Sequence, residues 1–474
     1  LSSEANTPTE VDFGDAVTVY VGETAILADE AFTPPESAEN YTHQGWVCDG
    51  VDQAPGDGIT IEPGDEGNEI TCTIENTRKT VDVVLQKTWE YGQVGDTASL
   101  GIASLESQMQ TAATSTVLTG AASEPDTSNQ AILTAYSGEV IELTETLSPD
   151  GSLYNTELSC DGLLNPDPLA ATSGSFTVPA DLAGTPAPET PITCTFTNTR
   201  KSATLRLAKS WVNAFVGDKV DAYTTGLGNY ATLLSEADTP TEIDYGDAIS
   251  VYVGETAVLS DERFDPFSAA ENYTDEGWVC DGVDQVPGDG ITIDPGDEGN
   301  LITCTIENTR KQAELSLQKE WVDATANDTA DLEASGEQEN DPENTGQSRS
   351  TATGLPGSEI DETNVVTITA YAGEKVALSE ILNRPDYYDA VLVCEDSVNE
   401  ASDGGDGTGE LLIDASDQDA SILCTFTNTR KSRGLSIQKT WINAIVGDVV
   451  DITAEASLES GEGSSEAVAV DQGP

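Results

Sequence analysis

Each full repeat of this chain contains a lysine, an acid and an asparagine in strand-like segments, three residue types that together can form a covalent bond. The lysine stands in a Lys-x-Trp run, at Lys87, Lys209, Lys319 and Lys439. The asparagine stands in Cys-Thr-Ile/Phe-x-Asn-Thr-Arg-Lys, at Asn76, Asn198, Asn308 and Asn428. The acid follows a Gly-Glu pair between the two, at Glu145, Glu380, Asp29 and Asp261.

The spacing of these residues predicts that they face the interior. Side chains alternate between the two faces of a strand, so Lys87 shares a face with Leu85 and Asn198 shares one with Phe196. Burial lowers the pKa of a lysine and raises that of a carboxyl. The neutral amine can then attack the asparagine carbonyl while the protonated acid polarises it, which releases ammonia and leaves an isopeptide bond. The alternative is that the lysine only snorkels or pairs with the acid and the asparagine caps a turn.

Internal repeats supply the elements that must position these residues. Asn-Thr-Arg-Lys ends four segments, and we place a boundary after each. The full blocks are then 80–201, 202–311 and 312–431, each of the size of one domain with its own core. Residues 1–79 form a partial domain without its first strand, and 432–474 supply the first strands of a further one. We therefore expect the chain to be a window cut from a longer array.

The pattern within each block predicts an all-β fold. Short apolar runs alternate with polar residues and are broken by Gly, Pro, Asp and Asn, as in Val-Asp-Val-Val-Leu-Gln-Lys-Thr-Trp. Many short strands in a block of this size favour a β-sandwich of immunoglobulin-like or prealbumin-like type. No Gly/Ser/Pro-rich linker separates the blocks, so we expect a stiff tandem array.

The charge of the chain excludes several classes of partner. The sequence has 86 acidic and 19 basic residues, a formal net charge of −67. Such a surface repels nucleic acid and anionic membranes. The acids are spread among alternating Val, Ile, Leu and Tyr in a chain that is 37% hydrophobic, so we reject disorder. The charge indicates a solvated surface suited to salty water, and the alternative is calcium binding.

The 8 cysteines fall two to a block, which predicts disulfides in an oxidising compartment. A zinc site would need cysteines from two blocks, because there is no Cys-x-x-Cys and only one His, His43. We recognise no signal peptide, lipidation motif or membrane span, and expect such signals outside this window. The expected pairs lie within blocks: Cys48–Cys72, Cys160–Cys194, Cys280–Cys304 and Cys394–Cys424.

Two other sets of residues are candidate sites. The acidic, Gly-rich loops between the cysteines of the short repeats hold carboxylates of the kind that suits calcium, although not at EF-hand spacing. These residues are Asp49, Asp52 and Asp57 and their counterparts Asp281, Asp284 and Asp289. The Arg-Lys pairs at the block ends can bridge acidic neighbours. No catalytic constellation or phosphate loop is present, so we expect no enzyme and no cofactor other than calcium.

At these residues the sequence resembles the Cna-B/SpaA-like prealbumin-fold domains of bacterial surface proteins. The similarity covers the Lys-Thr-Trp strand, the closing Asn-Thr, and Gly45-Trp46-Val47-Cys48 followed by Cys72-Thr-Ile-Glu-Asn76. The resemblance implies stalks, pili or adhesins outside the cell. It also implies Lys–Asn isopeptide bonds beside an acid: Lys87–Asn198 at Glu145, Lys209–Asn308 at Asp261 and Lys319–Asn428 at Glu380.

We therefore expect a structural segment of an extracellular bacterial fibre, whose partners are neighbouring copies or further repeats. The alternative is an adhesin array that binds a host or matrix glycan, with or without calcium. A hydrolase would need residues outside this window. The two ends suggest a further hypothesis: the strand around Leu435 to Trp441 completes a domain in a neighbouring copy, with Lys439 near Asp29 and Asn76. The alternative is a longer polypeptide in which each end simply continues.

Overall fold

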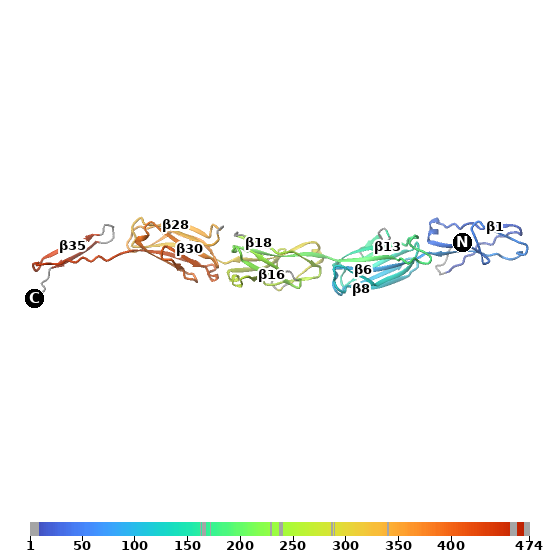
Figure 1. Cartoon of the computed structure of the whole chain (residues 1–474), viewed down its shortest axis with the longest axis horizontal. Helices are drawn as coiled ribbons and strands as arrows, with labels where there is room; N and C mark the ends of the chain where they lie inside the picture. Colours follow the sequence, from blue (N-terminus) through green and yellow to red (C-terminus); the bar gives the residue numbers. More distant parts are fainter. Residues whose placement is uncertain are drawn as a thin grey trace. The chain divides into compact units, whose positions relative to one another are not determined.

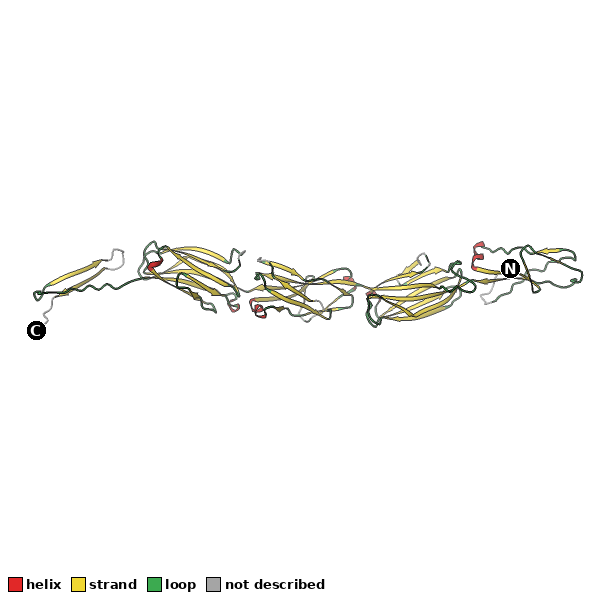
Figure 2. Ribbon diagram, in the orientation of Figure 1, coloured by secondary structure: helices red, strands yellow, loops and turns green. Residues whose placement is uncertain are grey.

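The chain folds almost entirely into β-strands joined by loops and short 3-10 turns (Figure 2). A computed structural model describes residues 9–161, 163, 167–170, 172–227, 230–236, 240–285, 288, 290–338, 341–455 and 462–468. The described strands are antiparallel or parallel members of small sheets, so the prediction of an all-β fold of sandwich domains is confirmed.

The chain divides into two compact units. The first comprises Leu1–Ala203, Ser250–Glu255 and Thr292–Asn300, and the second Thr204–Ile249, Thr256–Ile291 and Leu301–Pro474. Every described sheet draws its strands from one of the repeats found in the sequence. The block boundaries as such stay a prediction.

Residues 80–201 show the sandwich most fully, with β6, β8 and β13 labelled in Figure 1. One sheet has the order β11-β14-β6-β9 and the other the order β12-β13-β10-β7-β8. The strands are β6 (Thr80–Glu90), β7 (Thr97–Ser104), β8 (Gln110–Thr116), β9 (Glu124–Tyr136), β10 (Val140–Ser148), β11 (Tyr154–Cys160), β12 (Asp167–Ala170), β13 (Ser173–Thr177) and β14 (Ile192–Arg200), with the 3-10 turn η2 (Gly151–Leu153).

The core between these two sheets follows from the period-two pattern. Val83, Leu85 and Trp89 of β6 are fully buried, as are Leu143 of β10 and Phe196 of β14. Most of their neighbours in sequence are polar side chains that point to the outer faces, although Val84 is itself only 8% exposed. The first strand β6 and the last strand β14 lie side by side and parallel. The chain therefore enters and leaves this domain through two neighbouring strands.

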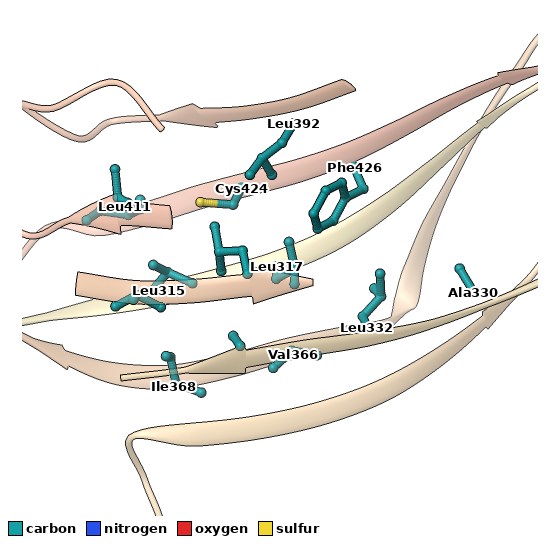
Figure 3. Packing of buried hydrophobic residues seen from close by; sticks show 14 of the residues in the cluster. Leu315, Leu317, Ala330, Leu332, Val366, Ile368, Leu392, Leu411, Cys424 and Phe426 are labelled. Carbon is teal, nitrogen blue, oxygen red and sulfur yellow. The ribbon is translucent and has the colours of Figure 1, made fainter. Parts of the chain in front are cut away.

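Residues 312–431 repeat this architecture in the second unit. The sheets have the orders β29-β26-β34-β31 and β28-β27-β30-β33-β32, and β26 runs parallel to β34. Figure 3 shows Leu315, Leu317 and Phe426 among the packed core side chains. The elements are β26 (Gln312–Val322), β27 (Thr329–Ser335), β28 (Thr345–Thr351), β29 (Ser358–Tyr371), β30 (Lys375–Leu382), β31 (Tyr388–Glu395), β32 (Ser402–Asp403), β33 (Thr408–Leu412) and β34 (Ser421–Arg430), with η5 (Pro385–Tyr387) and η6 (Ala415–Asp417).

The strands of residues 202–311 form two sheets of the same kind. One has the order β18-β15-β25-β22-β23 with β19 also on β15, and the other has the order β17-β16-β20-β24 with β21 also on β16. The first and last strands, β15 and β25, are again parallel. The elements are β15 (Ser202–Val212), β16 (Lys219–Thr225), β17 (Tyr230–Leu234), β18 (Thr241–Tyr245), β19 (Ile249–Tyr252), β20 (Thr256–Leu259), β21 (Arg263–Phe264), β22 (Tyr273–Cys280), β23 (Val283–Gln285), β24 (Gly290–Thr292) and β25 (Leu301–Arg310), with η3 (Phe267–Asn272) and η4 (Pro295–Asp297).

The described residues before Thr80 form two small sheets, β1-β4 and β3-β2-β5. Val21 is exposed there, whereas Val253, which holds the same place in the Tyr-Val-Gly-Glu run of residues 202–311, is fully buried. The elements are β1 (Thr24–Ile26), η1 (Pro35–Asn40), β2 (Tyr41–Cys48), β3 (Val51–Gln53), β4 (Gly58–Thr60) and β5 (Cys72–Arg78). Beyond Lys431, β35 (Val449–Glu455) pairs with β36 (Glu462–Val468).

Candidate crosslinking site

Lys87 lies in the middle of β6 with its side chain fully buried between the two sheets. Its Nζ is 3.6 Å from Oε1 of Glu145 on β10, and neither side chain is exposed to solvent. The ammonium also donates hydrogen bonds to the carbonyl oxygens of Phe196, at 3.2 Å, and Thr88, at 2.7 Å. It lies 4.2 Å from the ring centre of Trp89, on the same face of β6. The alternation of side chains that predicted an inward lysine is therefore observed.

Burial changes the acid–base properties of this pair. Desolvation lowers the pKa of Lys87 to about 8, although the negative charge of Glu145 opposes the shift. Desolvation likewise raises the pKa of Glu145, against the opposing effects of Lys87 and the Asn198 amide. The two shifts bring the amine and the carboxyl closer to a shared proton. A neutral amine beside a protonated acid is the state that nucleophilic attack requires.

Asn198 completes the group from the last strand. In the parallel pair of β6 and β14, Phe196 lies opposite Lys87 and Asn198 lies opposite Trp89. The asparagine is fully buried, and neither its Oδ1 nor its Nδ2 has a hydrogen-bond partner of regular geometry. The two carboxylate oxygens of Glu145 likewise have no hydrogen-bond partner of regular geometry. A buried amide without partners of regular geometry is costly to the folded state.

The same arrangement occurs in residues 312–431. Lys319 Nζ lies 3.6 Å from Oε2 of Glu380, and both side chains are fully buried. The lysine donates to the carbonyl oxygen of Phe426 at 2.8 Å. Desolvation lowers the pKa of Lys319 to about 8 and raises that of Glu380. Asn428 is buried and, like Asn198, has no regular partner for its amide.

In residues 202–311 the acid is Glu262, and the expectation of Asp261 is wrong. Lys209 Nζ lies 3.4 Å from Oε2 of Glu262, while Asp261 is exposed. Asn308 donates its amide to Oε1 of Glu262. Desolvation lowers the pKa of Lys209 to about 8 and raises that of Glu262.

A one-residue bulge explains this difference. Along β16, Thr224 pairs with Leu259 and Asp221 pairs with Arg263. Between these two pairs, the β20–β21 segment therefore contains one residue more than β16 does. This extra residue shifts by one position which side chains of the segment face the interior. Only weak evidence in the sequence indicated that Glu262 is the acid beside the lysine. A Glu directly follows each of the two Asp residues that were expected there, Asp29 and Asp261.

The first block contains the asparagine and the acid without a lysine. Asn76 donates its amide to Oε2 of Glu30 at 2.7 Å, so Glu30 takes the place predicted for Asp29, which is exposed. Lys439, the candidate lysine of the tail, is exposed and lies 4.9 Å from the ring centre of Trp441. The association of Lys439 with Asn76 between chains stays a prediction.

All four predicted disulfides are present, and no described cysteine is free. Each one joins residues that lie directly opposite each other in an antiparallel pair, as Cys160 of β11 does with Cys194 of β14. The disulfide thus ties the last strand to one neighbour, while the lysine lies on the other neighbour, β6. The two kinds of crosslink would hold different strand pairs.

The calcium hypothesis gains no support from the described residues. Asp49 and Asp57 accept hydrogen bonds from the backbone of Thr71 and Ala54, and Asp281 accepts one from Thr303. Among the described residues, no group of three acidic, His or Cys side chains is placed to hold a metal ion. Asp289 lies outside the described residues. Calcium binding by these loops therefore stays a prediction.

The Arg-Lys pairs contact acids at some block ends, as expected, but they bind backbone carbonyls as well. Arg78 lies 3.5 Å from Glu106 and Arg200 lies 3.8 Å from Glu255. Arg310, in contrast, donates to the carbonyl oxygen of Ala372. In the part of the chain that the structure describes, no helix has the length and apolar character needed to cross a membrane.

Comparison with known proteins agrees with the fold. Residues 84–200 match the family model of a prealbumin-like fold domain. The resemblance inferred from the repeats is thereby confirmed for this block, which contains Lys87, Glu145 and Asn198. No match is found among curated protein sequences.

Several solved structures resemble the chain at low identity. The Bacillus anthracis TIE protein is 12% identical with a TM-score of 0.35, and the match covers 77% of this chain and 54% of that one. A major pilin protein of Streptococcus pyogenes is 13% identical, with coverages of 49% and 98% and a TM-score of 0.27. A Mobiluncus mulieris adhesin with intramolecular disulfide, isopeptide and ester crosslinks is 12% identical, with coverages of 48% and 99% and a TM-score of 0.19. At these values the likenesses imply nothing further about this chain.

Proposed function

We propose that this chain is a structural segment of an extracellular bacterial fibre or stalk whose blocks are closed by Lys–Asn isopeptide bonds. The bonds join Lys87 to Asn198, Lys209 to Asn308 and Lys319 to Asn428. The observation that carries the proposal is the buried lysine, acid and asparagine on the first strand, the facing sheet and the last strand of each full block.

The chemistry needs only these three side chains. A proton moves from the lysine ammonium to the glutamate, and the neutral Nζ attacks the Cγ of the asparagine. The protonated glutamate polarises the amide oxygen and passes its proton to the leaving nitrogen, which departs as ammonia. The glutamate then takes the second proton that Nζ must lose to become an amide nitrogen. One C–N bond forms and one breaks, and no oxidant or cofactor is required. The position of Glu145 beside both Lys87 and Asn198 suits it to carry the proton at each step.

The proposed bond has a mechanical consequence that follows from the topology. Because β6 and β14 are adjacent and parallel, tension along the chain shears them past each other. Roughly 110 residues lie between Lys87 and Asn198, and the Cys160–Cys194 disulfide closes a separation of 34 within them, so on unfolding they would extend by about 250 Å at about 3.3 Å per residue. A covalent bond between the two strands would carry the tension directly and keep those residues folded. This property suits a fibre that must resist pulling.

The matched domain model and the composition support a role outside the cell. Four disulfides require an oxidising compartment, and the strongly acidic surface suits exposure to solvent. Neighbouring copies or further repeats are the partners that a tandem array of such domains would have. Binding of a glycan by individual blocks, the alternative function, stays a prediction that a glycan screen would test.

Intact mass spectrometry tests the proposal directly. The mass of the reduced, denatured chain should be lower than the sequence mass by one ammonia for each of three bonds. Lys87, Lys209 and Lys319 should also resist acylation in denaturant, while Lys439 should react and serve as an internal control. A full sequence mass with all four lysines acylated would show that the lysines are only buried ion pairs.

A further inference from the structure

Three of the four Arg-Lys pairs at the block ends hold the backbone of one residue in the block that follows. In the second unit, Arg310 Nε donates to the carbonyl oxygen of Ala372 at 2.8 Å. The N–H of the same Ala372 donates to the carbonyl oxygen of Lys311 at 2.9 Å. Ala372 is thus bound at both its backbone polar groups by two consecutive residues.

The same pair of bonds recurs at two other places in the first unit. Arg78 Nε donates to the carbonyl oxygen of Ser137 at 2.9 Å, and the Ser137 N–H donates to the carbonyl oxygen of Lys79 at 2.9 Å. Arg200 Nε donates to Val253 at 2.9 Å, and the Val253 N–H donates to the carbonyl oxygen of the lysine after Arg200 at 2.9 Å. We call this four-atom arrangement the clasp.

The residue in the clasp always belongs to a Tyr-x-Gly-Glu turn. In the turn that contains Ala372, the Glu374 N–H donates to the Tyr371 carbonyl and Gly373 has a φ of +83°. These two features define a type II turn with Ala372 at its second position. Glu374 also accepts a hydrogen bond from the Tyr371 N–H. The positive φ favours glycine at this position, and a Cβ on Gly373 would lie 2.5 Å from Nδ2 of Asn272, so a larger residue would also have to displace that side chain.

Because the arginine of the clasp is buried, breaking its hydrogen bond to the carbonyl oxygen would destabilise the folded state. Arg310 is 1% exposed, and its guanidinium carbon lies 3.1 Å from the ring centre of Phe215. A buried guanidinium needs acceptors, and the carbonyl of Ala372 supplies one. The lysine of the pair is itself anchored on its own block, because the Lys311 N–H donates to the carbonyl of Asn272 at 2.9 Å.

We infer that the clasp is a docking joint that locks the end of one block onto the Tyr-x-Gly-Glu turn of the next. It contacts only backbone atoms of the variable residue, which is Ser137, Val253 or Ala372 in the three cases. Any block that carries the turn therefore fits behind any block that ends in Arg-Lys. The turn from Tyr20 to Glu23 has the same internal bonds and a Gly22 φ of +84°, so it is a receiving surface for such a pair.

Composition agrees with this role for the Arg-Lys pairs. Four such pairs account for a large part of the 19 basic residues in a chain that otherwise avoids positive charge. The clasp gives three of these pairs a backbone partner in the next block, in addition to the acids that Arg78 and Arg200 contact. It is also independent of the isopeptide bonds, which join strands within a block.

Trypsin cleavage after Lys311 in the full 474-residue chain tests the joint. Arg310→Met removes the guanidinium, and Ala372→Pro removes only the N–H that Lys311 binds, since proline is accommodated at the second position of a type II turn. Both variants should be cleaved after Lys311 about tenfold faster than the wild type, because cleavage follows the population of the open joint. Arg349→Gln, at an exposed arginine paired with Asp331 in the same block, should leave the rate unchanged.

Ala372→Ser provides the matched test of backbone recognition, since Ser137 occupies the same place in another joint. It should be cleaved at the wild-type rate. Wild-type rates in both Arg310→Met and Ala372→Pro would overturn the joint. If Ala372→Ser were cleaved as fast as Ala372→Pro, the claim that the clasp contacts only the backbone of this residue would be overturned. Circular dichroism of each variant identifies any that fails to fold. If either Arg310→Met or Ala372→Pro fails to fold, the cleavage rate of the other one tests the joint.

Discussion

Replacing Asn198 by alanine separates the crosslinked state from a buried ion pair, because the two predict opposite outcomes. If no bond forms, the substitution removes a buried amide that has no regular hydrogen bond, and the stability of the block should change by no more than about 1 kcal/mol. If the bond forms, the substitution opens a covalent ring that spans most of the block. Lys87 and Glu145 remain in place in both cases.

The size of the loss follows from the loop that the bond closes. Roughly 110 residues separate Lys87 from Asn198, and the Cys160–Cys194 disulfide already closes a separation of 34 within them. An effective loop of about 80 residues corresponds to about 4.5 kcal/mol of loop-closure entropy in the unfolded state. For a domain of this size the loss should lower the melting temperature by about 15 to 20 °C.

Calorimetry and intact mass spectrometry of the same protein form the assay. The Asn198→Ala chain should retain two ammonia losses instead of three, and one thermal transition should move down while the others stay. Thr197→Ala is the matched control, because Thr197 is the adjacent residue on the opposite face of β14. It should keep all three ammonia losses and the wild-type transitions.

The reasoning would be refuted by an Asn198→Ala chain that melts at or above the wild-type temperature. Such a result, together with a wild-type mass equal to the sequence mass, would mean that burial alone explains the three side chains. A lowered melting temperature without any ammonia loss in the wild type would place the contribution of Asn198 in packing.

Three further predictions concern the acid, the lysines and the tail. Glu262→Ala should abolish one ammonia loss, whereas Asp261→Ala should preserve all three, and the reverse result would restore the acid expected from the alternation alone. In a chain with all three crosslink asparagines replaced by alanine, the lysine pKa is about 8 when folded and 10.5 when unfolded. Between these two pH values the unfolded state binds more protons than the folded state, so the melting temperature should rise as the pH increases from 8 to 10.5. The crosslinked chain is the control, because its lysine nitrogens are amides that do not titrate. If the tail strand completes another copy, the purified chain should polymerise head to tail at high concentration, and either Lys439→Met or deletion of 432–474 should weaken or abolish the polymers; an intact chain that stays monomeric would contradict this.

The inward position of the lysine and the asparagine could be predicted because it depends on local geometry. Lys87 follows Leu85 at a spacing of two, and a regular strand leaves no choice of face. The disulfide pairs could also be predicted, since two cysteines per block leave few partners. The acid in residues 202–311 could not, because a single extra residue between Leu259 and Arg263 inverts the alternation. Bulges are decided by the partner strand, which the local sequence does not identify.

The sequence by itself determined the repeat, the all-β class, the two faces of each strand and the cysteine pairs, because these depend on short-range spacing and composition. Only the tertiary structure decided that the first and last strands are adjacent and parallel, that Glu262 faces Lys209, and that Arg310 binds the backbone of Ala372. These three contacts join residues more than fifty positions apart in sequence. Their geometry depends on sheet order, strand register and the close approach of two blocks, which no local pattern of side chains specifies.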